Sequence, residues 1–265
     1  MVQSALASDR TIAVLWRYRD LVRNLVAKDI KVRYMDAALG FAWALVNPFV
    51  TTLMYLVIFT YIFPSGVPHY TLFLVTGILH WMFFAQVIAQ SPELLVANAS
   101  LIKKIYFPRI LIPLAGLLVN LILWLVTFVV YMAFFPILGG RFTLYMLAYP
   151  AYLFLFIAFT FGISLILATM YVHFRDVKHI VEVFLQVLFW SAPILYPLDI
   201  IGERARTYIL ISPLVEFTEI FHRFFYDGRL PSASLTASFS LWTFASLSVG
   251  LWIFGHWMPK LVEDL

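Results

Sequence analysis

The chain contains no cysteine, and only 12% of its 265 residues are charged. The absence of cysteine excludes disulfide bonds, thiol catalysis and thiolate metal sites. Soluble domains carry about 25% charged residues, so the low charge indicates a lipid environment. Five stretches contain no Asp, Glu, Lys or Arg, namely residues 37–92, 110–140, 142–174, 183–198 and 230–258. These stretches are candidates for segments within a membrane.

Apolar residues make up 63% of the chain, against roughly 45–50% in soluble proteins. A membrane-spanning helix needs about 20 apolar residues, because it rises ~1.5 Å per residue through about 30 Å of hydrocarbon. The apolar runs are continuous and do not alternate, which favours helices over a β-barrel. Six spans are predicted, at residues 43–63, 72–89, 110–135, 144–170, 180–198 and 235–257. The sequence predicts an all-α integral membrane protein with one transmembrane domain over residues 1–265.

Residues 14–34 form a strongly amphipathic stretch before the first span. Apolar residues recur there at helical spacing, and basic residues occupy much of the remaining surface. A basic amphipathic helix of this kind lies in the headgroup plane, with its apolar side in the acyl boundary. A helix packed on a partner protein would show the same pattern. We predict an N-terminal interface helix at residues 14–34 and leave open whether lipid, protein or both cover it.

The positions of Lys and Arg indicate how the spans are oriented. With an even number of spans, both termini lie on the same side of the membrane. That side collects 13 of the 18 basic residues, and the other side has 5. Basic residues concentrate in cytoplasmic loops, so both termini are expected in the cytoplasm. The pI of about 9.2 then reflects this bias, and nucleic acid is not an expected partner.

Motifs for chemistry within the chain are missing. The sequence has no Gly-x-x-x-x-Gly-Lys-[Ser/Thr] phosphate loop, no Gly-x-Ser-x-Gly and no His-Glu-x-x-His. No Asp, Glu or Arg lies in the middle of a predicted span, as ion-coupled carriers usually require. His80, deep in the second span, serves either as a hydrogen-bonding group between helices or as a proton relay. We predict that the chain is not an enzyme, has no catalytic, metal or cofactor site, and takes its driving force from another chain.

Aromatic residues make up 18% of the chain and gather within or near the predicted spans. Aromatic faces stack on the apolar C–H faces of sugar rings, but aromatic belts at the membrane interfaces are also common. Both interpretations stay open for each residue. The residues predicted to line a track for a glycan are Tyr55, Phe59, Trp81, Phe84, Phe189, Trp190 and Tyr196.

The external segment 199–234 is long for a connector and rich in apolar residues. Ser212 and Pro213 are typical of a helix start, with Ser at the N-cap and Pro at the first helical position, and they predict a helix through Tyr226. This helix is too apolar for a solvated loop, so a re-entrant or interfacial helix fits better. Within a membrane it must be buried in protein or line a cavity. Pro193 and Pro197 indicate that the fifth span ends in a kink there.

Several motifs, taken together and in order, resemble a known family across nearly the whole chain. They are RYRDL at 17–21, DIKVRY at 29–34, LGFAWALVNP at 39–48, GILHWMFF at 77–84, NASLIKK at 98–104, YFPR at 106–109, FRDV at 174–177, SAPILYP at 191–197 and SPL at 212–214. In this combination the chain is similar to the ABC-2 type permeases of bacterial polysaccharide exporters. Those subunits move O-antigen, capsule or teichoic acid chains.

The resemblance implies a homodimer of this chain in the bacterial inner (plasma) membrane, working with two cytoplasmic ATPase subunits that bind ATP and Mg. It implies that the loop after the second span is a coupling helix gripped by the ATPase. The residues placed there are Ser100, Leu101, Lys103, Lys104 and Tyr106. It also implies a pair of re-entrant gate helices near the external exit. The residues placed there are Pro213, Glu216, Phe217 and Phe221.

The predicted function is export of a lipid-diphosphate-linked polysaccharide that enters from the cytoplasmic side. The phosphates would be held by Lys28, Lys31, Arg33 or Arg109, although the same residues also fit anchoring to anionic lipid. One alternative is an exporter of the same architecture for a small hydrophobic drug or a modified oligosaccharide. The others are a membrane enzyme acting on polyprenyl-linked sugars and a scaffold protein.

Overall fold

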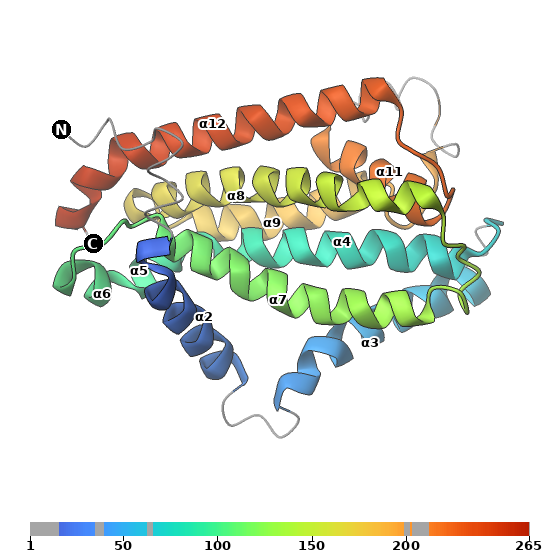
Figure 1. Cartoon of the computed structure of the whole chain (residues 1–265), viewed down its shortest axis with the longest axis horizontal. Helices are drawn as coiled ribbons and strands as arrows, with labels where there is room; N and C mark the ends of the chain where they lie inside the picture. Colours follow the sequence, from blue (N-terminus) through green and yellow to red (C-terminus); the bar gives the residue numbers. More distant parts are fainter. Residues whose placement is uncertain (1–15, 35–39, 63–65, 199–201, 203–211, 265) are drawn as a thin grey trace.

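The computed structural model describes residues 16–34, 40–62, 66–198, 202 and 212–264. Within these residues every regular element is a helix and no strand occurs, which confirms the all-α prediction. The long helices run side by side along one axis (Figure 1). They are α4 (Tyr70–Gln90), α7 (Leu111–Phe134), α8 (Tyr149–His173) and α12 (Ala233–Asp264).

Four stretches of the described residues are long and apolar enough to cross a membrane. They are Tyr70–Gln90, Leu111–Phe134, Leu144–His173 and Ala233–Met258, the third of which joins the short helix η3 (Leu144–Ala148) to α8. These stretches correspond to the predicted second, third, fourth and sixth spans. The chain is therefore a multi-pass membrane protein.

The predicted first and fifth spans contain shorter α-helices. Helix α3 (Trp43–Val57) follows the short turn η1 (Gly40–Ala42) and continues into the π-helical stretch η2 (Ile58–Ile62). Helix α9 (Val177–Ser191) ends before Pro193, where a kink at the end of the fifth span was predicted, so the helix stops short of the predicted span boundary at residue 198. Proline has no N–H for the helix ladder and disfavours the helical conformation of the residue before it. With 15 residues, α9 is only about 22 Å long, shorter than the ~30 Å hydrocarbon layer.

Helices α8 and α12 pack together at unusually close range. A Cβ atom on Gly162 of α8 would collide with the backbone of Ser246, and one on Gly250 of α12 would collide with the carbonyl oxygen of Gly162. The Ser246 hydroxyl also donates a hydrogen bond of 3.2 Å to the carbonyl of Phe159. In lipid no hydrophobic force drives helices together, so small residues that allow close packing hold such pairs.

The predicted interface helix is found as α2 (Arg19–Tyr34), while residues 14 and 15 of that prediction lie outside the described part of the chain. In Figure 1, α2 starts at the end of the bundle that also holds α5 (Leu94–Ala97) and α6 (Ala99–Lys104). Leu21 and Val22 of α2 pack against a buried cluster that contains Leu95 and Ile102. The chain itself therefore covers part of the apolar side of this helix.

Helix α11 (Pro213–Phe225) lies toward the other end of the bundle, near the loop between α7 and α8 (Figure 1). Ten of its 13 residues are buried, and it packs against α4 and α12. The prediction of a helix starting at Pro213 is confirmed, and it ends one residue before Tyr226. Residues 199–201 and 203–211 of the external segment lie outside the described residues. Because α11 is buried in protein, it meets the condition under which such a helix can lie within a membrane.

Candidate functional site

Four of the aromatic residues predicted to line a glycan track contact one another across three helices. Tyr55 of α3 and Trp81 of α4 both contact Phe189 of α9, each with ring centroids 5.6 Å apart. Trp81 also contacts Phe84 of α4 at 5.7 Å. Trp81 and Phe84 are buried, and Phe189 is half-buried. These four residues, called the aromatic cluster below, therefore form part of the packed interior of the single chain.

Two further members of that prediction extend the aromatic cluster towards the surface. Trp190 contacts Phe189 at 5.7 Å and is 59% exposed. The hydroxyl of Tyr196 donates a hydrogen bond of 2.7 Å to the carbonyl of Trp190. The side chain of Phe59 lies outside the described residues. The structure thus brings together all the predicted track residues whose side chains it describes, but only Trp190 presents most of its surface.

Two of the predicted gate residues connect α11 to α4 through ring contacts. Phe217 contacts Phe84 of the aromatic cluster at 5.9 Å. Phe221 stacks on His80 with centroids 3.8 Å apart and the planes inclined by 17°. His222, the next residue along α11, stacks on Phe73 of α4 at 3.8 Å, and its Nε2 lies 3.0 Å from the Phe73 carbonyl oxygen. Two ring stacks, each with a histidine, therefore hold α11 against the N-terminal half of α4.

The remaining gate residues occupy the start of α11. Pro213 is its first residue, and Glu216 is 96% buried. Glu216 Oε1 accepts a 2.5 Å hydrogen bond from the Ser238 hydroxyl of α12, and Oε2 has no hydrogen-bond partner in the described part of the chain. No three His, Cys, Asp or Glu side chains among the described residues gather as a metal site requires. Glu216 is thus a polar contact between α11 and α12.

The predicted coupling residues lie on α6 and just beyond it. Ser100, Lys103, Lys104 and Tyr106 are exposed, Tyr106 by 90%, while Leu101 is half-buried. Between them Ile102 points into the protein and is buried. A short helix with one buried anchor and an exposed basic and aromatic side is suited to contact with another protein. No partner chain is needed to form this surface, because the chain's own core holds it.

The four basic residues predicted to hold phosphates do not converge on one site in the structure. Lys28 donates a hydrogen bond of 3.3 Å to Asn98 Oδ1 beside the coupling segment. Arg109 donates to the carbonyl of Met258 at 3.0 Å, near the end of α12. Lys31 is exposed on α2. Lys28 lines a pocket among α2, α5 and α6, and Arg33 lines a second pocket among the long helices.

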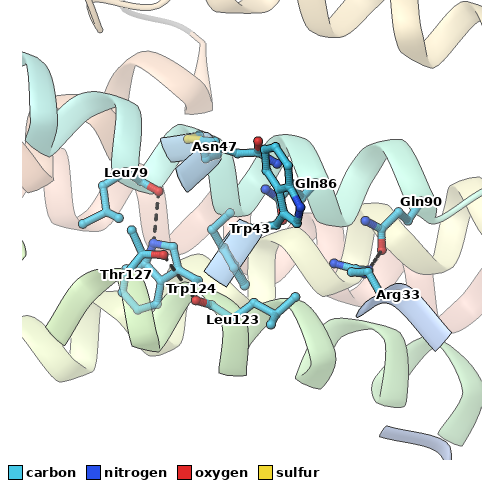
Figure 2. A pocket seen from close by; sticks show the side chains of 11 residues that line it. Arg33, Trp43, Asn47, Leu79, Gln86, Gln90, Leu123, Trp124 and Thr127 are labelled. Carbon is cyan, nitrogen blue, oxygen red and sulfur yellow. Dashed lines mark hydrogen bonds between the residues drawn. The ribbon is translucent and has the colours of Figure 1, made fainter. Parts of the chain in front are cut away.

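That pocket, called the Arg33 pocket below, has a volume of about 310 Å³ and lies among α2, α3, α4 and α7 (Figure 2). Arg33 donates hydrogen bonds to Gln90 Oε1 at 2.6 Å and to Asn120 Oδ1 at 3.2 Å. Asn47 and Gln86 also line it. These four amides were not among the predicted site residues, although Gln86 and Gln90 stand four residues apart on one face of α4 within a stretch that carries no charge.

Comparisons with known proteins agree with this architecture. The ABC-2 type transporter family matches residues 20–226. An O-antigen export system permease protein RfbA from Klebsiella pneumoniae is 33% identical over 93% of this chain and 95% of its own length. Another RfbA, from Myxococcus xanthus, is 31% identical over 84% of this chain and 87% of its own. The polysialic acid transport protein KpsM from Escherichia coli is 24% identical over 87% of this chain and 90% of its own. The chain therefore belongs to the ABC-2 type transporter family.

Proposed function

We propose that this chain is the permease subunit of an ABC exporter that carries lipid-linked polysaccharide across the bacterial inner (plasma) membrane. The observation that carries the proposal is the 33% identity, over 93% of the chain, to a permease named for O-antigen export. The lack of recognisable catalytic motifs supports a role in transport. The ring contacts among Tyr55, Trp81, Phe84 and Phe189 support a sugar as cargo, because successive rings offer successive stacking surfaces.

The proposed topology has six spans with both termini in the cytoplasm. Helix α3 and η2 together cover 20 residues, or about 30 Å, which is enough for the first span. Helix α9 enters from the cytoplasmic side, and α11 returns as a re-entrant gate helix supported by α4 and α12. The distribution of Lys and Arg supports this orientation, since 13 of 18 fall on the side of the termini.

An ABC-2 transporter works with a partner ATPase. We propose that two copies of this chain pair with two ATPase subunits, which hold ATP and Mg, and that α6 receives their movement. The exposure of Lys103, Lys104 and Tyr106 supports this docking surface. The hydrogen bond from Lys28 to Asn98 would pass the movement of α6 to the interface helix α2.

The proposed route starts at the cytoplasmic leaflet, where basic residues attract the diphosphate of the lipid-linked glycan. Among the four phosphate candidates Arg33 is favoured, because two indole rings, those of Trp43 and Trp124, line its pocket. The glycan then follows the aromatic cluster to the gate helix α11. Because Trp81 and Phe84 are buried, passage along these rings requires α9 to move away from α4 during transport. Export of a small hydrophobic drug by the same architecture stays as the second candidate.

Gene deletion tests the proposal in the living cell. We expect a strain without this chain to lose surface polysaccharide and to accumulate lipid-linked glycan on the cytoplasmic side, and a plasmid copy to reverse both changes. Fractionation of lipid-linked glycan between cytoplasm and surface measures this. A plasmid copy with Phe189→Leu changes the aromatic cluster, and a matched copy with Phe154→Leu changes an exposed aromatic residue of α8. Comparing the two copies shows whether export depends on the aromatic cluster in particular. An unchanged surface polysaccharide in the deletion strain would reject the proposal.

A further inference from the structure

The Arg33 pocket is lined by polar groups and extends from the end of α4 to the middle of that helix. Its lining extends along α4 from Gln90, at the helix end, to Leu79. Eleven residues of helix separate these positions, which is about 16 Å at ~1.5 Å per residue. The pocket therefore extends through about half of a hydrocarbon layer of ~30 Å. Polar groups at that depth are costly unless they serve a site, so the pocket suits a polar group carried on a lipid.

No carboxylate of a described residue neutralises the charge at the mouth of the pocket. Arg33 donates both of its hydrogen bonds to neutral amides, those of Gln90 and Asn120. Asn120 in turn donates to Gln90 Oε1 at 3.1 Å. The lining contains no Asp or Glu, and no carboxylate of a described residue lies within ion-pair distance of Arg33. A positive guanidinium held in place by two amides is a fitting partner for a phosphate.

The lining of the pocket offers hydrogen-bonding groups beside aromatic rings. Asn47 of α3 and Gln86 of α4 line the pocket, and within the described part of the chain their amides make no hydrogen bond. Each amide provides both donors and an acceptor, the combination that a hydroxyl group needs. The indoles of Trp43 and Trp124 also line the pocket, and the Trp124 N–H is occupied by the carbonyl of Leu79 (Figure 2). Free amides with indole rings suit a sugar ring.

We propose that the Arg33 pocket binds the first sugar of the lipid-linked glycan, the one joined directly to the lipid phosphate. Arg33 holds the phosphate, Asn47 and Gln86 bond the sugar hydroxyls, and the lipid chain stays in the hydrocarbon. At about 310 Å³ the pocket is at the lower limit for ligand sites, so it takes one headgroup unit and not a polymer. The inference rests on the proposed function and adds that the permease recognises the phosphate-proximal end of its cargo.

Binding to the full chain with its partner ATPase, in lipid nanodiscs, tests this. The probes are a short polyprenyl diphosphate bearing one hexose or one N-acetylhexosamine, the same diphosphate without sugar, and phosphatidylglycerol. Native mass spectrometry gives the affinity of each. We expect at least one sugar-bearing probe to bind about tenfold more tightly than the bare diphosphate, since two or more hydrogen bonds of ~0.5–1.5 kcal/mol each are gained. Equal binding of sugar-bearing and bare probes would overturn the proposal without any substitution.

Substitutions then locate the site. Gln86→Leu should remove most of the tenfold preference and leave binding of the bare diphosphate unchanged, whereas Arg33→Gln should weaken both probes. Gln186→Leu makes the same chemical change at an exposed position of α9. It should change neither the preference for the sugar-bearing probe nor the binding of the bare diphosphate. If Gln86→Leu kept the preference for the sugar-bearing probe, or if phosphatidylglycerol competed equally well for the pocket, the sugar site would be overturned. Because these readouts measure binding, their failure alongside glycan accumulation in the deletion strain would reject this inference and not the proposed function.

Discussion

The imidazole of His80 stacks on the ring of Phe221, with centroids 3.8 Å apart and the planes inclined by 17°. Both nitrogens of His80 are also engaged, Nδ1 with the Thr76 carbonyl at 2.8 Å and Nε2 with the Tyr149 hydroxyl at 2.9 Å. A carbonyl can only accept, so Nδ1 carries the proton and Nε2 accepts from Tyr149 in the neutral ring. His80 therefore joins three helices, which favours the hydrogen-bonding interpretation over the proton relay.

Replacing His80 separates these two interpretations. His80→Leu leaves the Tyr149 hydroxyl buried without its acceptor, so we expect a loss of about 1–3 kcal/mol in stability. Thermal unfolding of the purified chain measures this, and Tyr149→Phe in the same background should recover part of it. His80→Gln keeps a hydrogen-bonding side chain and should retain export. Folded His80→Gln protein without export would instead support the relay.

The ion pair between Lys178 and Glu93 connects the start of α9 to the loop that precedes α5 and α6. Its atoms lie 2.8 Å apart, and the side chains are 34% and 48% exposed. Exposed pairs contribute about 0–1 kcal/mol, so Glu93→Lys should change the unfolding temperature little. Because the pair links the coupling segment to the helix that carries Phe189, we expect Glu93→Lys to lower export severalfold. The charge-swapped pair Glu93→Lys with Lys178→Glu should restore surface glycan, and no recovery would argue against this linkage.

Two glycines of α12 offer a matched test of its packing against α8. A Cβ on Gly250 would collide with the Gly162 backbone, whereas one on Gly255 meets nothing within 4 Å. Gly250→Ala should therefore cost about 1–3 kcal/mol through overpacking. Gly255→Ala should be neutral or stabilise by up to about 1 kcal/mol, since alanine is the better helix former. Thermal unfolding compares the two, and equal effects would contradict the close contact of α8 with α12.

Tyr106 tests the coupling surface without disturbing the fold. It is 90% exposed, so Tyr106→Ala should leave the unfolding temperature unchanged. We expect the variant to recover much less partner ATPase in co-purification, because an exposed aromatic side chain is typical of an interface hot spot. Tyr145→Ala, at a 48% exposed position of η3 at the opposite end of the bundle, is the control. Full recovery of the ATPase with Tyr106→Ala would remove this residue from the docking surface.

Much of the fold could be predicted from the sequence because lipid imposes a simple rule. Uncharged runs of 20 or more residues must be helical, and four of the six predicted spans appear as helices of sufficient length. The start of α11 could also be predicted, since Ser212 and Pro213 specify a helix start locally. Residues 192–198 are as apolar as the helix before them, so composition extends the fifth span to residue 198, and only Pro193 and Pro197 indicate that the helix ends earlier.

The site was less predictable because it depends on which faces meet. Composition could select aromatic residues but could not show that Trp81 and Phe84 are buried under neighbouring helices. Lys28, Lys31, Arg33 and Arg109 were predicted as alternative phosphate partners, and the sequence could not show that Lys28 and Arg109 hydrogen-bond to different parts of the chain. The amides of the Arg33 pocket come from three helices, and Asn47 and Asn120 are isolated polar residues in apolar runs. Tertiary packing decides such sites, and the sequence order does not reveal it.

Transport by the reconstituted complex tests whether this chain carries lipid-linked polysaccharide. Proteoliposomes that contain this chain and its partner ATPase receive a lipid-linked glycan on the face exposed to ATP, and a lectin or glycosidase on the opposite face detects its arrival. We expect the glycan to arrive only when ATP and the permease are both present, and we expect no such movement of a hydrophobic dye. Transport of the dye without any movement of the glycan would contradict this expectation and favour the drug exporter.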